Sequence, residues 1–167
     1  MGGFFIFACM KKILNPERQN ASYNCYGCCP SNPIGLKMEF FEDGEYVVST
    51  WLPNVDFQSY TNVLHGGIQM ALLDELACWV MMVKVGTAGF TQRMEIDFKK
   101  NVFICHGAVT LKARVREIVG DLAYIEAYLI DKDGIVRTEA LAIYFIYPEK
   151  IARKRLNYPG PENFIRE

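Results

Sequence analysis

Gly66, Gly67 and Asp74 are the residues whose types and spacing point most directly to chemistry. The two glycines follow His65 and precede an almost wholly apolar run. Free backbone N–H groups at the start of a helix can hold a negatively charged oxygen, and glycine lets a carbonyl group approach them closely. Asp74 would supply a general base or a nucleophile. The pattern predicts an active site in which a carbonyl group is attacked.

Asp74 has mostly apolar neighbours one and two turns away on the predicted helix. They are Met70, Ala71, Ala77, Cys78 and Met81. Such a surrounding removes water from a carboxylate, which suits a general base and is costly for an unpaired charge. Two interpretations therefore stay open. Asp74 acts in the reaction, or Asp74 or Glu75 has a structural role, capping a partner helix or pairing with a core arginine.

One long helix must position these groups. We predict it from residue 65 to about residue 84, with Gly86 ending it. Its polar residues before that end are Gln69, Asp74 and Glu75. A helix that is apolar on nearly all sides is buried, either by a large sheet or between subunits.

Strands are predicted on both sides of this helix. Residues 36–41 and 45–52 indicate a hairpin with a turn at Asp43 and Gly44. After the helix the apolar period changes to two, which predicts strands at 90–98, 109–116, 122–130 and 135–147. Short links favour antiparallel pairing. The order predicts an α+β fold in which an antiparallel sheet wraps around one central helix.

Two stretches of sequence resemble a known family. Residues 63–75, with the strands that follow, resemble the hotdog-fold acyl-CoA thioesterases, in the branch related to the phenylacetic-acid-pathway (PaaI-like) thioesterases. Cys25-Tyr-Gly-Cys28-Cys29, ahead of Asn-Pro-Ile-Gly-Leu36, resembles an N-terminal signature of the same branch. The resemblance covers roughly residues 24–148. It implies the hotdog fold and hydrolysis of an acyl-CoA thioester to a free acid and coenzyme A.

The resemblance also implies roles for particular residues. His65 would line the carbonyl side of the substrate, the Gly66 N–H would form the oxyanion hole, and Asp74 would be the base or nucleophile. Thr91 would position the attacking water. Further substrate contacts would come from Gly67, from Gln58, Ser59 or Asn62 near the water, and from Lys99 and Lys100 near the coenzyme A phosphates. Alternatively, the two lysines lie at the solvent-exposed end of a strand and contact no ligand.

The spacing of Gly66 and Asp74 implies a dimer. They are eight residues apart, so they lie roughly 12 Å apart along one helix and cannot both touch one carbonyl group. The oxyanion hole and the carboxylate must then come from two chains whose helices run antiparallel, so that the site spans a twofold interface. The family resemblance likewise implies homodimers, often paired into homotetramers.

Composition excludes several classes of partner. The formal net charge is −1 and the pI is about 6.2, so no basic field favours nucleic acid. We expect a cytoplasmic protein with no membrane association and with its six cysteines reduced, since 51% of the residues are hydrophobic. No cofactor is expected beyond coenzyme A as part of the substrate.

Three of these cysteines have spacing typical of half a zinc site. A structural site needs four ligands, and no other cysteine or histidine repeats the spacing of Cys25, Cys28 and Cys29. We therefore expect no metal and predict that these thiols pack beside the acyl pocket. Side chains predicted to line that pocket are Phe57, Met70, Trp79, Met81 and Met82, with a core position as the alternative for each.

Three segments organise the chain. We predict a partly disordered N-terminal extension at residues 1–23, a hotdog thioesterase domain at 24–148, and a charged C-terminal tail at 149–167 for which we predict no element. Met10 is an alternative start to Met1.

Two other functions are alternatives to hydrolysis. One is a non-catalytic hotdog protein that binds acyl-CoA or an acyl carrier. The other is a hotdog dehydratase, but the motif of that group places Asp and His close together, and no Asp precedes His65 within such a motif here. The acyl chain, the thiol carrier and the choice between dimer and tetramer stay open.

Overall fold

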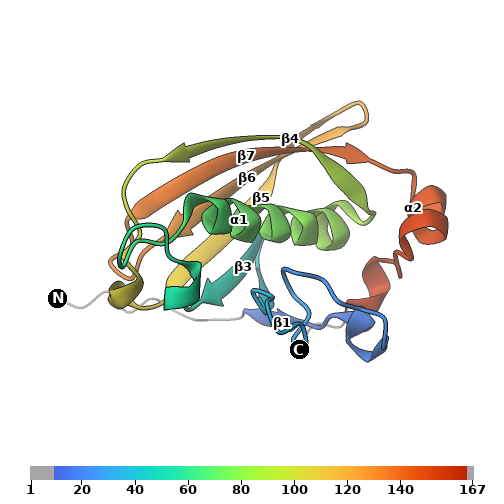
Figure 1. Ribbon diagram of the computed structural model, residues 1–167. Helices are drawn as coiled ribbons and strands as arrows, with labels where there is room; N and C mark the ends of the chain where they lie inside the picture. Colours follow the sequence, from blue (N-terminus) through green and yellow to red (C-terminus); the bar gives the residue numbers. More distant parts are fainter. Residues whose placement is uncertain (1–9, 165–167) are drawn as a thin grey trace.

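A computed structural model describes residues 10–164 and shows one antiparallel sheet curving around a long helix (Figure 1). The sheet has seven strands in the order β1-β2-β3-β5-β6-β7-β4. Their bounds are β1 Lys11–Ile13, β2 Phe40–Asp43, β3 Tyr46–Trp51, β4 Gly89–Phe98, β5 Val109–Val119, β6 Leu122–Ile130 and β7 Val136–Ile146. The predicted hotdog fold is confirmed. The predictions for residues 1–9 lie outside the described residues, and Met10 as an alternative start stays a prediction.

Helix α1, Gly66–Val80, continues through a π-helical turn, η3 at Met81–Val85. Gly86 ends it in the left-handed region, with φ 80°, as the sequence predicts. Short 3₁₀ turns lie elsewhere, η1 at Pro16–Gln19, η2 at Val55–Phe57, η4 at Ile104–His106 and η5 at Pro161–Asn163. No helix in residues 10–164 combines the length and apolar character needed to cross a membrane.

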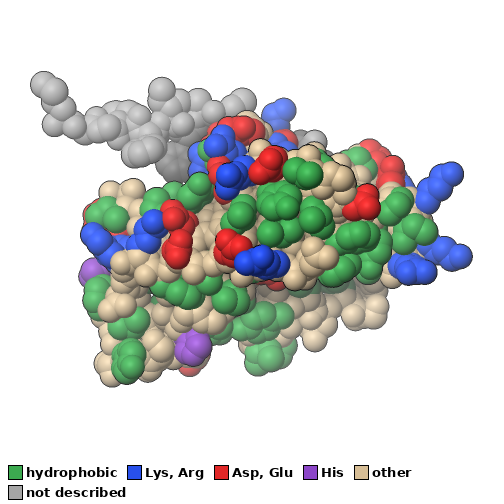
Figure 2. Space-filling view, turned by 90° about the horizontal axis from the view of Figure 1, so that it is seen from above, with side chains coloured by type: hydrophobic (Ala, Val, Ile, Leu, Met, Phe, Trp, Pro, Cys, Tyr) green, Lys and Arg blue, Asp and Glu red, His purple; other side chains and the backbone are tan. Residues whose placement is uncertain are grey.

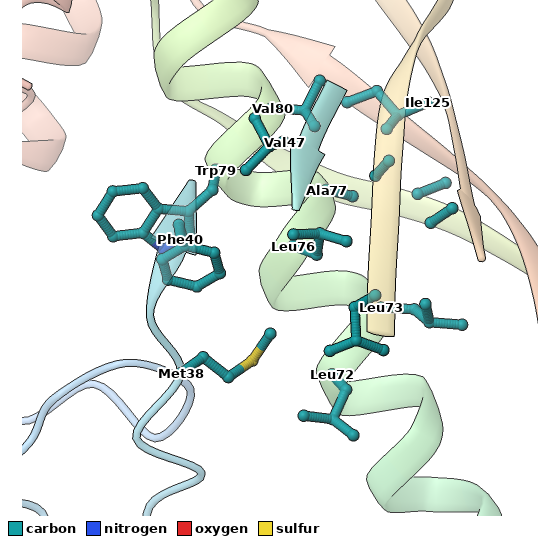
Figure 3. Close-up of a cluster of buried hydrophobic side chains, with 14 of the residues drawn as sticks. Met38, Phe40, Val47, Leu72, Leu73, Leu76, Ala77, Trp79, Val80 and Ile125 are labelled. Carbon is teal, nitrogen blue, oxygen red and sulfur yellow. The ribbon is translucent and has the colours of Figure 1, made fainter. Parts of the chain in front are cut away.

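The core lies between α1 and the concave face of the sheet (Figure 3). Leu72, Leu73 and Leu76 of α1 are fully buried there. Strands β3, β5 and β6 present alternate residues to them, among them Val47, Leu111, Ile125 and Leu129. On the other side of the helix the Trp79 ring stacks on Phe40 of β2 with centroids 4.3 Å apart. These contacts fix how α1 is rotated against the sheet.

The first predicted strand begins later than its apolar pattern suggested. Residues 36–38 do not join the sheet, because their backbone pairs with an N-terminal loop instead. The Leu36 N–H donates to the Tyr26 carbonyl at 2.8 Å and the Met38 N–H donates to the Gly27 carbonyl at 2.9 Å. Within the predicted N-terminal extension, β1 pairs with β2. The cysteine-containing loop is thereby held against the domain.

The C-terminal tail contains an element that the sequence analysis did not predict. Helix α2 spans Glu149–Leu156 and ends at Asn157 in the left-handed region. Beyond it, Tyr158 and Phe164 are buried, and the Tyr158 hydroxyl donates to the Met82 carbonyl at 2.7 Å. The Phe164 ring meets Trp79 edge-on with centroids 5.6 Å apart. These two aromatic side chains attach a charged segment to the end of α1.

Strand β4 forms one edge of the sheet and pairs only with β7 among the described strands. Its ten residues are interrupted by a bulge between Thr91 and Arg93. Phe90 and Phe98 are 45% and 50% exposed. A long unpaired edge with exposed aromatic side chains is a surface suited to pairing with another strand.

The turn between β6 and β7 depends on one buried carboxylate. Asp131 accepts the N–H groups of Asp133 and Ile135, both at 2.9 Å, and the Nε of Arg137 at 2.6 Å. Burial alone would raise the pKa of Asp131, but these hydrogen bonds and the guanidinium outweigh it and lower the pKa below its usual value. The charged form is therefore the one that stabilises the turn.

We expect Asp131→Asn to lower the free energy of unfolding by roughly 1–3 kcal/mol at neutral pH, because an amide cannot satisfy all three donors. Since the folded pKa is depressed, this stabilisation is complete above the unfolded pKa and is lost as pH falls through the folded pKa. Urea unfolding of the wild type and of Asp131→Asn at several pH values between neutral and acid measures this difference in the free energy of unfolding. The two stabilities should converge in acid. Asp133→Asn, an exposed carboxylate in the same turn, is the control and should change stability by less than about 0.5 kcal/mol.

Candidate active site on helix α1

Asp74 accepts two hydroxyl hydrogen bonds on the same carboxylate oxygen. Thr91 of β4 donates from Oγ1 to Asp74 Oδ1 at 2.7 Å, and Tyr144 of β7 donates to that oxygen at 2.9 Å and to the Asp74 carbonyl at 3.0 Å. No hydrogen bond from the described residues involves Oδ2. One oxygen is thus fixed in place, and the other is available to water or substrate.

Both donors are placed by strand geometry. Tyr144 continues the inward-facing series Ala140, Ala142 of β7 and is 2% exposed. Burial, with Cys78 and Asp74 nearby, raises the pKa of Tyr144 above its usual value, so its hydroxyl keeps its proton and stays a donor. Thr91 directly precedes the bulge in β4, and bulges redirect side chains near functional sites.

Asp74 lies on the exposed face of α1 together with Gly67 and Met70. These residues are three, four and seven positions apart, which places them on one side of the helix. Met70 is 39% exposed although it is apolar, whereas Asp74 is half-buried. One apolar side chain therefore lies on this face between the N-terminus of the helix and the carboxylate.

The helix N-terminus offers one backbone donor. His65 Nδ1 accepts the Gly67 N–H at 2.9 Å, so the neutral ring carries its proton on Nε2. No hydrogen bond among the described residues uses the Gly66 N–H. A Cβ at Gly66 would lie 3.3 Å from the Phe98 ring, so a larger residue would press against β4. Of the two glycines, Gly66 has the N–H that remains for a ligand.

The polar residues of the preceding loop mostly bond within it. Gln58 accepts the Asn62 N–H at 3.1 Å. Asn62 has a φ of 66°, and its side-chain amide donates to the Cys105 sulfur through Nδ2 and accepts the Cys105 N–H at Oδ1. The Ser59 hydroxyl donates weakly to the Val63 carbonyl at 3.4 Å. None of the three contacts Asp74. Their predicted place near the catalytic water stays a prediction.

A residue not singled out in the sequence analysis positions the helix start. Gln69 is buried, donates to the Leu64 carbonyl at 3.1 Å and accepts the Thr138 hydroxyl at 2.5 Å. It links the loop before α1 to β7. Tyr144 was also missed. Its only signal in the sequence is that a tyrosine in an inward-facing strand position needs a partner for its hydroxyl.

Other predicted residues have different surroundings. Lys99 pairs with Glu139 at 2.7 Å and is exposed, as is Lys100. Trp79 and Met81 belong to the core, while Phe57 and Met82 are half-buried against it. A hollow of about 590 Å³ opens along β2 and β3 and does not include Asp74.

Glu75 does not pair with an arginine among the described residues. It accepts the Trp79 Nε1 at 3.0 Å and the Cys25 thiol at 3.6 Å. Burial, and then the charge of Cys25, raise the pKa of Glu75 to about 7. A hydrogen bond with Cys28 lowers the pKa of Cys25 to about 5. These groups form a second cluster beside the Asp74 site.

Comparison with known proteins agrees with the fold. Residues 61–138 match the family model described as the thioesterase superfamily. The matched segment is a little less than half of the chain. It contains α1, β4, β5, β6 and the start of β7, and so includes Asp74 and Thr91. Among curated proteins none matches this chain.

Solved structures with the superfamily's fold resemble the chain at low sequence identity. One described as a thioesterase superfamily protein has 18% identity and a TM-score of 0.67, covering 72% of this chain and 59% of its own. The E. coli PaaI protein from the phenylacetic acid degradation operon has 17% identity, a TM-score of 0.60, and coverage of 68% and 82%. A Streptococcus mutans protein bound to acetyl CoA has 15% identity and a TM-score of 0.61, and the match covers 67% of this chain and 90% of that protein. The resemblance to hotdog thioesterases, PaaI among them, is confirmed.

We expect Asp74→Ala and Tyr144→Phe to be energetically coupled, because the tyrosine hydroxyl donates to the carboxylate. A double-mutant cycle on urea unfolding should give an interaction energy of about 0.5–3 kcal/mol. The pair Tyr144→Phe with Asp131→Asn shares no hydrogen-bond partner and should be additive within about 0.5 kcal/mol. Equal additivity in both pairs would show that the Tyr144–Asp74 hydrogen bond does not contribute to the folded state in solution.

Proposed function

We propose that this protein hydrolyses the thioester bond of an acyl-CoA to a free acid and coenzyme A. The observation that carries the proposal is the Asp74 carboxylate, fixed through one oxygen by Thr91 and Tyr144 with the other oxygen available. The match of residues 61–138 to the thioesterase superfamily model supports thioester hydrolysis in general. Solved relatives bound to acetyl CoA or coenzyme A support a coenzyme A substrate.

The chemistry requires a stabilised oxyanion and an activated oxygen nucleophile. Attack on the thioester carbon moves the carbonyl electrons onto oxygen, and the Gly66 N–H would stabilise that charge. Collapse expels the sulfur as the thiolate of coenzyme A. In one route Asp74 takes the proton of the attacking water and returns it to sulfur. In the other Asp74 attacks directly and water hydrolyses the resulting anhydride.

His65 is suited to assist at the carbonyl. Its Nδ1 accepts the Gly67 N–H, so its Nε2–H can donate to a substrate oxygen. Gly67 would contribute by allowing close approach rather than by donating its own N–H. Lys99 and Lys100, both exposed at the end of β4, would meet the coenzyme A phosphates at the rim of the site.

A homodimer would complete this site. Gly66 and Asp74 belong to one straight helix, so one chain does not bring them to the same carbonyl group. Antiparallel pairing of two β4 edges about a twofold axis would place two α1 helices side by side in opposite directions. It would also cover Met70, Phe90 and Phe98. Charged side chains of both signs lie among hydrophobic ones on the surface shown in Figure 2.

We expect the wild-type protein to release thiol from acyl-CoA esters with a rate that depends on the acyl group. The panel would run from acetyl to palmitoyl and include phenylacetyl and benzoyl esters. Asp74→Ala should lower kcat by about 10²–10⁴-fold, the range for loss of an acid–base group. Asp133→Asn, which changes an exposed carboxylate far along the chain, should retain full activity.

If wild-type protein binds acyl-CoA without turning any ester over, the proposal fails and the non-catalytic binding function is favoured. A single turnover in ¹⁸O-labelled water tests the nucleophilic route. Label recovered in the Asp74 carboxylate would identify that route, with water attacking the Asp74 carbonyl of the anhydride. Label confined to the product acid is expected both for the general-base route and for opening of the anhydride at the acyl carbon, and trapping of the anhydride with hydroxylamine separates these two.

The shared site predicts complementation between two inactive variants. Gly66→Pro removes the N–H at the first helical position, where proline is tolerated, and His65 at φ −61° and ψ 134° suits a residue before proline. Gly66→Ala adds a Cβ but keeps the N–H, so it is the matched control and should keep more activity. Mixed dimers of Gly66→Pro with Asp74→Ala should each hold one intact site and recover activity. Purified mixed dimers as inactive as their parents would contradict a site shared between chains.

A further inference from the structure

Two cysteines and a glutamate converge on one point beside α1. The ligand atoms of Cys25, Cys28 and Glu75 all lie within 4.8 Å of one another. The Cys25 sulfur is 3.6 Å from each oxygen of the Glu75 carboxylate. The two cysteines come from the N-terminal loop and the glutamate from the middle of α1, 50 residues away in sequence.

The loop is shaped to fit closely over the carboxylate. A turn brings the Cys29 N–H to the Cys25 carbonyl at 3.2 Å, which brings Cys25 and Cys28 to the same side. A Cβ at Gly27 would lie 2.3 Å from the Glu75 Cδ, so only glycine permits this approach. Hydrogen bonds from Leu36 and Met38 hold the loop from behind.

Cys28 and Glu75 have further polar contacts. The Tyr23 hydroxyl lies 2.8 Å from the Cys28 sulfur, and Asn15 Nδ2 donates to that sulfur at 3.8 Å. Trp79 Nε1 donates to Glu75 Oε1 at 3.0 Å. Donors of this kind orient thiolate and carboxylate ligands around a bound metal and favour their charged forms.

No cationic side chain among the described residues pairs with Glu75, Cys25 or Cys28. Three groups that can each carry a negative charge therefore face one another in a largely buried position. Burying such groups without a compensating cation is costly. Cys28 is buried, while Cys25 and Glu75 are half-buried, so an ion could reach the cluster from solvent.

We propose that Cys25, Cys28 and Glu75 bind a zinc ion. Two thiolates and a carboxylate are ligands that zinc accepts, and thiolates select it over magnesium and calcium. With metal–ligand distances of about 2.0–2.3 Å, tetrahedral ligands lie roughly 3.3–3.8 Å apart, a spacing that the Cys25–Glu75 contact already has. Three protein ligands leave one coordination position for water or a small ligand.

Cys29 takes no part in this site. Its sulfur lies 3.3 Å from the Tyr23 carbonyl and 3.2 Å from the Ser31 hydroxyl. The glutamate supplies the ligand that the cysteine spacing lacks, which the sequence analysis did not foresee because the contact depends on the fold. The zinc would attach the N-terminal loop to α1 one residue away from Asp74. This inference rests on no assumption about the reaction.

The test uses the full chain purified under reducing conditions without chelator. Elemental analysis should find about one zinc per chain. Cobalt exchanged for zinc should give thiolate-to-cobalt charge-transfer absorption. Cys25→Ser and Glu75→Gln should each weaken zinc binding by more than about 10–100-fold, since loss of an outer-shell partner alone costs that much. Cys29→Ala, a buried cysteine in the same loop, is the control and should bind zinc like wild type.

Two results would overturn the proposal. One is wild-type protein that gives no thiolate charge-transfer absorption with cobalt, a measurement that needs no variant to fold. The other is zinc binding that survives in both Cys25→Ser and Glu75→Gln, or that is lost in a folded Cys29→Ala protein. Circular dichroism of each variant distinguishes loss of the site from loss of the fold.

Discussion

The burial of α1 by the sheet is the constraint on which the other features depend. A helix packed on leucines cannot leave a polar side chain without a partner, because an unsatisfied buried group costs several kcal/mol. Its three polar side chains, Gln69, Asp74 and Glu75, are each met by a different part of the chain. Gln69 joins the loop before the helix to β7, Asp74 meets β4 and β7, and Glu75 meets the N-terminal loop. The helix thereby determines where these distant segments lie.

Local patterns were sufficient to predict the long helix and most strands of the fold. The end of α1 at Gly86 follows from glycine's access to the left-handed region, and period-two alternation identified β5, β6 and β7. The pattern was less informative for residues 36–38, whose apolar side chains are buried without a strand. It was also silent on α2, because this helix is attached by Tyr158 and Phe164, which lie beyond its end.

The candidate site was predictable only in part. His65, Gly66 and Asp74 could be named because their spacing along one helix is a local property. Tyr144 could not be paired with Asp74, since 70 residues separate them and nothing in either segment encodes the register between β7 and α1. The same limit applies to Cys25 and Glu75. Contacts between segments far apart in sequence arise from how the sheet closes on the helix, which no single window of sequence contains.

Strand β4 approaches both ends of the candidate site. Its Thr91 holds Asp74, and its Phe98 lies over the Gly66 end of the helix. The same strand is the free edge of the sheet. A partner bound to that edge would therefore contact the strand that reaches both ends of the site. The activity of the site would then depend on the concentration of the protein by mass action. Dilution below the dissociation constant of the assembly would abolish that activity while each chain stays folded.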